Sequence, residues 1–174
     1  VFTYPGDTPE TGDLRAYADQ AIATIRGWAE RADGRMRLVL TAADVREAFA
    51  TEERPVYALI GLEGCDPLQG RAGDLQRYFD MGVRHIIPAW DDNTFSGTAQ
   101  GSGGPLSEEG FRLIELAQEL RVMVDVSHLS DAAFWQVQQI ARRPFIASHS
   151  DCRTLCAAPR NLTDDMIRAL AGRG

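Results

Sequence analysis

The sequence predicts an α/β fold in which short buried strands alternate with amphipathic helices. Apolar runs of strand length are separated by segments with helical periodicity, and three of these runs end in a metal-capable side chain: Glu63, His128 and His149. The carboxyl ends of parallel strands meet at one edge of a sheet, where α/β proteins place their chemistry. Candidate residues on several successive strand ends favour a (β/α)8 TIM barrel. A doubly wound nucleotide-binding sheet is disfavoured, because the Gly-rich stretch 97–104 matches neither phosphate-binding pattern.

The first half of the chain gives a helix, a short strand and a short helix before the run that ends at Glu63. Residues 13–33 carry apolar side chains at helical spacing, residues 37–40 form an apolar run, and Thr41 begins a capped helix that continues to Ala50. Residues 56–63 then form one continuous predicted strand. A helix over 72–81, ended by Gly82, leads directly into a strand over 83–89.

The second half repeats the alternation after a polar, Gly-rich loop. The predicted elements are a helix over 107–120, a strand over 122–128, a helix over 130–140 with Ser130 as N-cap, a strand over 144–149, a helical turn through Cys156 and a helix over 163–171. No change in composition and no linker interrupts this pattern. We therefore expect one domain over residues 1–174.

A complete barrel needs about 250 residues and eight strands, and about five strands are predicted here. The opening residues resemble a loop that leaves an earlier strand, and the last helix ends at residues 172–174 as if a further strand should follow. We therefore expect the central part of a barrel that lacks the first and last strands.

Composition excludes several partner classes. The net charge of −7 and the absence of a basic block argue against nucleic acid or an anionic membrane as the main partner, and no apolar run approaches the roughly 18 residues that span a bilayer. All 18 basic residues are arginine, which suggests a GC-rich bacterial source. Three cysteines are too few for a disulfide framework, so we expect a cytoplasmic setting. Cys152 and Cys156 could join His149 in a zinc cluster, but small buried hydrophobes on one helix face are the stronger interpretation.

Six motifs, in order, resemble the membrane (renal-type) dipeptidases, zinc peptidases of family M19 among the amidohydrolase-like barrels. The resemblance runs from about Tyr17 to the end of the chain. The motifs are Gly61-Leu-Glu-Gly64, Gly82-Val-Arg84, Gly104-Pro-Leu-Ser107, Val124-Asp-Val-Ser-His-Leu-Ser130, Ile146-Ala-Ser-His-Ser150 and Pro159-Arg-Asn-Leu-Thr163.

The resemblance implies a metal-dependent hydrolase barrel with two Zn²⁺ ions per full-length subunit, a metal-bound hydroxide that cleaves the amide of a small dipeptide, and a possible homodimer. It implies that Glu63 bridges the two ions, that His128 and His149 complete the second ion's ligands, and that Arg160 binds the substrate carboxylate. Trp90 occupies a substrate-binding position where mammalian members have a histidine. The family's first-strand His-x-Asp pair is missing, as is an aspartate on the last strand, so we expect the fragment alone to be inactive.

Each candidate also has a purely structural interpretation. A strand-end histidine is often a hydrogen-bonded structural residue, Glu63 could cap the next turn, and Arg160 could be a solvated residue at a helix start. We expect His85 to be a core or interface histidine and Asp125 to serve packing or a hydrogen bond behind the site. The alternative function is a non-catalytic binding module derived from a barrel, or a metal-dependent amidohydrolase with a non-dipeptide substrate.

Overall fold

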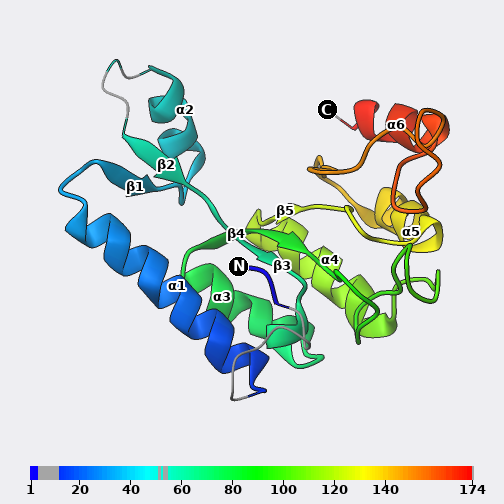
Figure 1. The fold of residues 1–174 in the computed structure, drawn as a ribbon, viewed down its shortest axis with the longest axis horizontal. Coiled ribbons are helices and arrows are strands. Elements are labelled where there is room, and N and C mark those ends of the chain that lie inside the picture. The colour runs from blue at the N-terminus through cyan, green and yellow to red at the C-terminus, as the bar shows by residue number, and fades with distance from the viewer. Residues whose placement is uncertain (4–11, 51, 53–54, 174) are drawn as a thin grey trace.

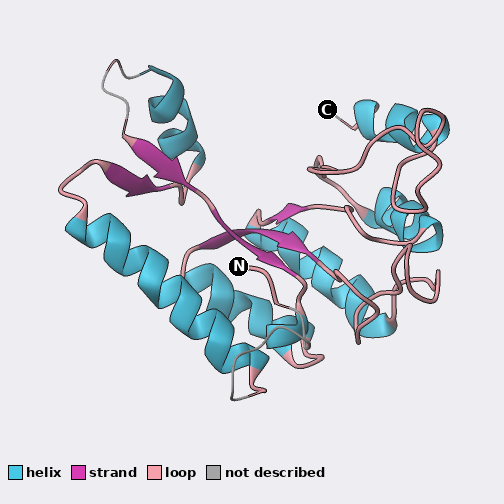
Figure 2. Cartoon of the chain, in the orientation of Figure 1, coloured by secondary structure: helices cyan, strands magenta, loops and turns pink. Residues whose placement is uncertain are grey.

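The computed structural model describes residues 1–3, 12–50, 52 and 55–173. Helices and short parallel strands alternate along the chain (Figures 1 and 2). The α-helices are α1 (Leu14–Arg31), α2 (Ala42–Ala50), α3 (Leu75–Asp80), α4 (Glu108–Leu120), α5 (Asp131–Ile140) and α6 (Asp164–Ala171). The strands are β1 (Met36–Leu38), β2 (Val56–Ala58), β3 (Ile60–Glu63), β4 (Val83–Ile87) and β5 (Met123–Val124), and 3-10 turns η1 (Asp66–Leu68) and η2 (Ala72–Asp74) precede α3.

The central sheet has the order β3-β4-β5, and all its strands are parallel. Single parallel bridges extend it on both sides, from Phe2 to Glu63 beside β3 and from Ile146 to Asp125 beyond β5. From β3 to Ile146, neighbours in the sheet follow one another along the chain. The carboxyl ends of these segments therefore lie at one edge, in the order in which the chain reaches them.

Helices bury the sheet because their apolar faces pack against it. Contacts join α3 to β4 and α4 to β5, and the buried cluster includes Leu62 from β3, Ile86 from β4 and Ile114 from α4. Serine or threonine side chains cap the helices that follow the strand ends: Ser107, Ser130 and Thr163 each accept a hydrogen bond from a backbone N–H in the first turn. Within the described part of the chain, no helix is both long and apolar enough to cross a membrane.

The prediction of one strand over 56–63 is wrong. The segment divides at Leu59: β2 pairs with β1 in a separate two-stranded sheet, whereas β3 pairs with β4 and shifts register between Ile60 and Gly61. The physical reason is that the two halves have different partners, and one straight strand cannot serve both sheets. Figure 1 shows the β1-β2 pair and α2 standing apart from the central sheet.

Other boundaries also differ from the predictions. The strand over 144–149 is reduced to one bridge at Ile146, because only two backbone hydrogen bonds connect it to residues 124 and 126. The helix predicted from residue 72 begins as the 3-10 turn η2. The predicted helical turn through Cys156 is confirmed as a single turn, closed by a hydrogen bond from Cys156 N to Cys152 O. Phe2 forms a parallel bridge with Glu63, and the rest of the predicted opening loop, residues 4–11, lies outside the described residues.

Candidate metal centre

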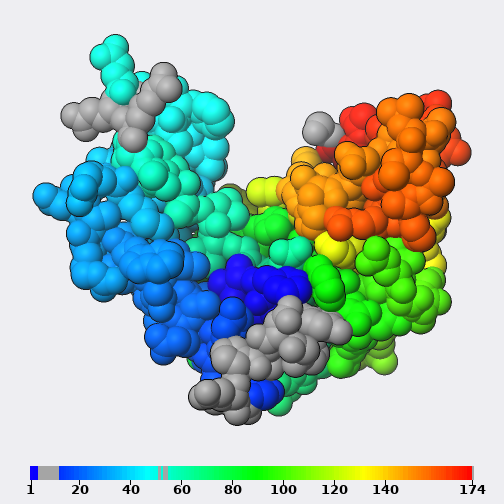
Figure 3. All heavy atoms as spheres, in the orientation of Figure 1, coloured from blue at the N-terminus to red at the C-terminus, as the bar shows by residue number. Residues whose placement is uncertain are grey.

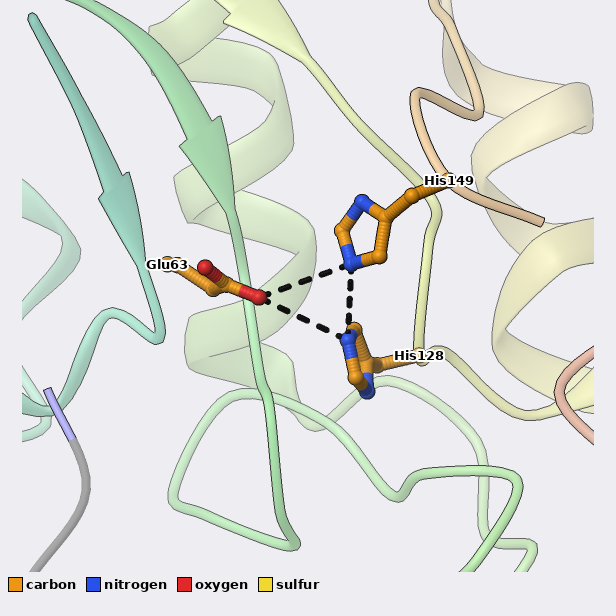
Figure 4. A group of neighbouring side chains, drawn as sticks. All are labelled: Glu63, His128 and His149. Carbon is orange, nitrogen blue, oxygen red and sulfur yellow. Dashed lines mark hydrogen bonds and ion pairs between the residues drawn. The ribbon is translucent and has the colours of Figure 1, made fainter. Parts of the chain in front are cut away.

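Glu63, His128 and His149 converge at the carboxyl edge of the central sheet. Glu63 ends β3, His128 follows β5, and His149 lies three residues beyond the Ile146 bridge. The Nε2 atoms of the two histidines are 2.9 Å apart. Glu63 Oε1 lies 3.6 Å from the His128 Nε2 and 3.4 Å from the His149 Nε2, so the three side chains point at one volume (Figure 4).

This donor set fits a divalent metal ion. The ligand atoms of the three residues lie within 4.8 Å of one another, and imidazole nitrogen and carboxylate oxygen are common zinc ligands. Two imidazole nitrogens and a carboxylate that face each other so closely need a shared proton or a cation between them. Among the described residues, no other group of three such side chains is found.

The local environment keeps His128 neutral, which is the form that binds a metal. The His128 side chain is only 5% exposed, and burial, followed by the positive charge of Arg160 and the proximity of His149, lowers its pKa to about 4. Its backbone has φ of +71°, a left-handed conformation that is uncommon for a residue with a Cβ. The structure therefore holds this histidine in an unusual backbone conformation next to the candidate metal position.

His149 is more accessible, and its ring is oriented by its neighbour. Its side chain is 39% exposed, and Ser148 Oγ lies 2.7 Å from its Nδ1. A hydrogen bond donated by Nδ1 to that hydroxyl leaves the lone pair of Nε2 directed at Glu63 and His128. This is the arrangement in which metal-binding histidines use one nitrogen as ligand and the other as donor.

Trp90 and Arg160 lie beside the three central residues. The Trp90 ring centroid is 5.7 Å from that of His128 and 5.0 Å from that of Phe2. Trp90 comes from the loop after β4, the strand between β3 and β5. Arg160 Nη2 donates a 2.7 Å hydrogen bond to the His149 carbonyl oxygen, so its guanidinium is attached to the site and is not simply solvated.

A network of polar side chains lies behind the histidines, and only part of it was predicted from the sequence. The expected hydrogen-bonding role of Asp125 is confirmed: its carboxylate accepts from the backbone N–H groups of Ser127 and Ser148 and contacts His85 Nε2 at 2.9 Å. The role of Ser127, whose hydroxyl accepts from His149 N, was missed. A usable signal was present, because Ser directly precedes both candidate histidine ligands.

The cysteines take no part in the site. Cys152 and Cys156 are free thiols outside the Glu63, His128 and His149 group, and Cys152 contacts Asp164. Cys156 is exposed, so its expected burial on a helix face is wrong. The reason is that residues 152–156 form a single turn at the surface, so no longer helix is present to bury both thiols on one face.

Comparison with known proteins places this chain in a family. The chain is 35% identical over 163 residues to an uncharacterized protein in the pqqA 5′ region of Klebsiella pneumoniae, covering 89% of this chain and 59% of the relative. It is 33% identical to the dipeptidase verJ of Clonostachys rogersoniana, covering 92% of this chain and 42% of the relative. The chain thus spans about half the length of these relatives.

Solved structures give the same picture. A metallopeptidase from Rhodobacter sphaeroides, liganded with a phosphinate mimic of the dipeptide L-Ala-D-Ala, superposes with a TM-score of 0.80 at 27% identity, covering 90% of this chain and 48% of that one. The fold is also that of the probable dipeptidase PvdM from Pseudomonas aeruginosa, with a TM-score of 0.86 at 22% identity over 98% of this chain and 46% of that one. The family model described as membrane dipeptidase (Peptidase family M19) matches residues 2–174, and this chain belongs to that family.

Proposed function

We propose that the complete protein is a zinc-dependent dipeptidase with a binuclear metal site, and that Glu63, His128 and His149 supply ligands to it. The convergence of these three side chains carries the proposal, because a carboxylate and two imidazoles from separate segments point at one volume. In this assignment Glu63 bridges the two ions, since its two oxygens can serve one ion each, and the two histidines complete the ligands of one ion.

The proposed scaffold is a single-domain (β/α)8 barrel of which residues 1–174 form the central part. The parallel sheet supports it, because Glu63, Trp90, His128 and His149 follow neighbouring segments of that sheet in chain order. Barrel enzymes carry their active sites at this edge. The likeness to the metallopeptidase from Rhodobacter sphaeroides, of which the chain covers 48%, is consistent with this assignment.

Two four-coordinate zinc ions need more protein ligands than the one carboxylate and two imidazoles found among the described residues. Because the chain spans about half the length of its relatives, we propose that further ligands lie outside residues 1–174 and that this chain alone does not hydrolyse dipeptides. Bound zinc would supply Lewis-acid polarisation of an amide carbonyl and activation of water near neutral pH. The chain's own residues would orient the substrate.

Arg160 is proposed to bind the substrate's terminal carboxylate. A guanidinium presents several N–H donors in a planar fork, and only one Arg160 nitrogen is engaged by the His149 carbonyl oxygen. Its position at the rim therefore leaves donors for a carboxylate beside the metal ligands. Trp90 would form an apolar wall against which the substrate packs, because its ring already lies against His128.

The first experiment measures zinc content and dipeptide hydrolysis in the complete protein and in the 174-residue chain, with and without a chelator. L-Ala-D-Ala is the first substrate to test, because a mimic of this dipeptide occupies the Rhodobacter sphaeroides relative. We expect about two zinc ions and chelator-sensitive hydrolysis in the complete protein only. A complete protein that binds no zinc and hydrolyses no dipeptide would contradict the proposed function.

Glu63→Gln in the complete protein tests the bridging role. The amide keeps the shape of the side chain but loses the charge, so we expect hydrolysis to fall by at least about a thousandfold while the fold persists. Glu47→Gln is the control, because Glu47 forms an exposed ion pair with Arg37 away from the site and should leave hydrolysis unchanged. Wild-type turnover by Glu63→Gln would rule out the bridging role.

A further inference from the structure

We propose that Asp125 and Ser127 form a clamp that positions His128 and His149 for metal binding. The clamp consists of the Asp125 carboxylate and the Ser127 hydroxyl, which together join the two backbone segments that carry the histidines. Neither residue belongs to the group of three candidate ligands, so each would act as a positioning residue. This inference rests on the proposed metal site and adds residues on which its geometry depends.

Asp125 is fully buried, and one of its oxygens is shared by the two segments. Oδ1 accepts a 2.9 Å hydrogen bond from Ser127 N and a 3.2 Å hydrogen bond from Ser148 N. Each of these serines directly precedes a candidate histidine ligand. A single carboxylate oxygen therefore fixes the backbone at both positions immediately before the ligands.

Ser127 adds a second connection between the same segments. Its side chain is buried, and its Oγ accepts a 3.2 Å hydrogen bond from His149 N. Thus Ser127, the residue before His128, holds the backbone of His149, while Asp125 holds the backbone of both segments. Two hydrogen-bond acceptors on the segment that carries His128 therefore fix its distance from the segment that carries His149.

The clamp is needed because regular strand pairing is sparse where the histidines lie. β5 ends at Val124, and beyond it the Asp125–Ile146 bridge is the last parallel pairing before either histidine. His128 also has φ of +71°, a conformation that persists only when its surroundings enforce it. Side-chain hydrogen bonds therefore hold the two segments together where parallel backbone pairing between them has ended.

His85 and Gly61 support Asp125 from the neighbouring strands. His85 Nε2 contacts the other carboxylate oxygen at 2.9 Å, which orients the carboxyl plane. A Cβ at Gly61 would overlap His85 Nδ1, so the glycine leaves room for the imidazole. The network thus runs from β3 through β4 to the two histidine segments.

The test compares zinc affinity, measured by competition with a chromophoric chelator, in Asp125→Ala, Ser127→Ala and Gln118→Ala variants of the complete protein. Gln118 is the matched control. It is buried, and its Oε1 accepts from two backbone N–H groups, those of Arg142 and Arg143, which lie at the start of the His149 segment, on the far side of the Ile146 bridge from the histidine. Circular dichroism and urea unfolding establish that each variant is folded when zinc affinity is measured.

We expect Asp125→Ala and Ser127→Ala each to lower zinc affinity by about ten- to a hundredfold, the usual effect of losing a residue that orients metal ligands. Gln118→Ala should lower stability but change zinc affinity less than about twofold. If Asp125→Ala does not fold, the zinc affinity of Ser127→Ala tests the clamp by itself. Unchanged zinc affinity in folded Ser127→Ala, or an equal loss in Gln118→Ala, would overturn the clamp.

The two proposals fail in different ways. If the wild-type complete protein binds no zinc, the proposed function fails and the clamp fails with it. If the wild type binds zinc, Glu63→Gln loses it, and the clamp variants bind zinc as tightly as the wild type, only the clamp is overturned.

Discussion

At the scale of single residues, Asp125 combines complete burial with a negative charge. Burial by itself would raise the pKa of its carboxyl, but hydrogen bonds from His85, Ser148 and Ser127 outweigh that effect and hold the pKa below its usual range. In the unfolded chain these hydrogen bonds are lost, and the carboxyl returns to a pKa of about 3.9. The lowered pKa is thus a property of the fold.

This difference predicts a specific acid sensitivity. As pH falls below about 4, the unfolded chain binds a proton at Asp125 before the folded chain does, so the free energy of unfolding decreases. In metal-free Asp125→Asn this contribution is absent. We expect the wild-type advantage over Asp125→Asn in urea unfolding to shrink by at least about 1 kcal/mol between pH 6 and pH 3.

The same comparison removes the other carboxyls with lowered pKa from consideration. The others are present in both proteins, so their effects cancel in the difference: Asp19, Asp44, Asp74, Asp92 and Glu109. A difference between wild type and Asp125→Asn that stays constant from pH 6 to pH 3 would contradict the assignment of a lowered pKa to Asp125.

At the scale of secondary structure, α4 is fixed against the loop that follows β4. Ser107 N donates to the Phe95 carbonyl oxygen, and a Cβ added to Gly110, one turn further, would overlap that same oxygen. The glycine is therefore required by the close approach of a loop backbone to the first turn of the helix, and not by the helix itself.

Paired substitutions distinguish helix propensity from packing. A Cβ added to Gly27 in α1 would meet only the end of the flexible Arg31 side chain, at 2.9 Å, so Gly27→Ala should stabilise the protein by about 0.5 to 1 kcal/mol. Gly110→Ala gains the same propensity but must displace the Phe95 backbone. We expect it to destabilise the protein by about 1 to 3 kcal/mol in urea unfolding. If Gly110→Ala instead stabilised the protein, the loop backbone at Phe95 would be able to move away from the added Cβ at little cost in free energy.

These elements also explain what could be predicted from the sequence. The helices from Ser107, Ser130 and Thr163 begin where their caps predict, because capping depends on residues a few positions apart. The predicted strand bounds were wrong at Leu59 and over 144–149, because a strand exists only where a partner lies beside it. The convergence of Glu63, His128 and His149 was predictable from strand ends. The clamping role of Ser127 was not, because it depends on which backbone N–H its hydroxyl meets.

At the scale of the whole molecule, the candidate metal centre joins segments that lie far apart in the sequence. Glu63 belongs to the β3 side of the sheet, and His128 and His149 belong to the side that leads into α5 and α6. Figure 3 shows the face of the molecule hollowed between the N-terminal elements around α2 and the C-terminal segment. A metal ion held by all three residues would therefore cross-link two parts of the fold that otherwise meet through the central sheet.

This cross-link predicts that zinc stabilises the complete protein against urea. An ion that binds only the folded state adds about 2.7 kcal/mol to the free energy of unfolding when its free concentration is 100 times the Kd. We expect at least this increment in the wild type, a much smaller one in Glu63→Gln, and the full wild-type increment in Cys156→Ser, because Cys156 is exposed and outside the three-residue group. Urea midpoints with buffered zinc and with excess chelator measure it. Equal midpoints in the two conditions for the wild type would mean that the three side chains meet without holding a metal, whereas loss of the increment in Cys156→Ser would move the ion to the cysteine turn.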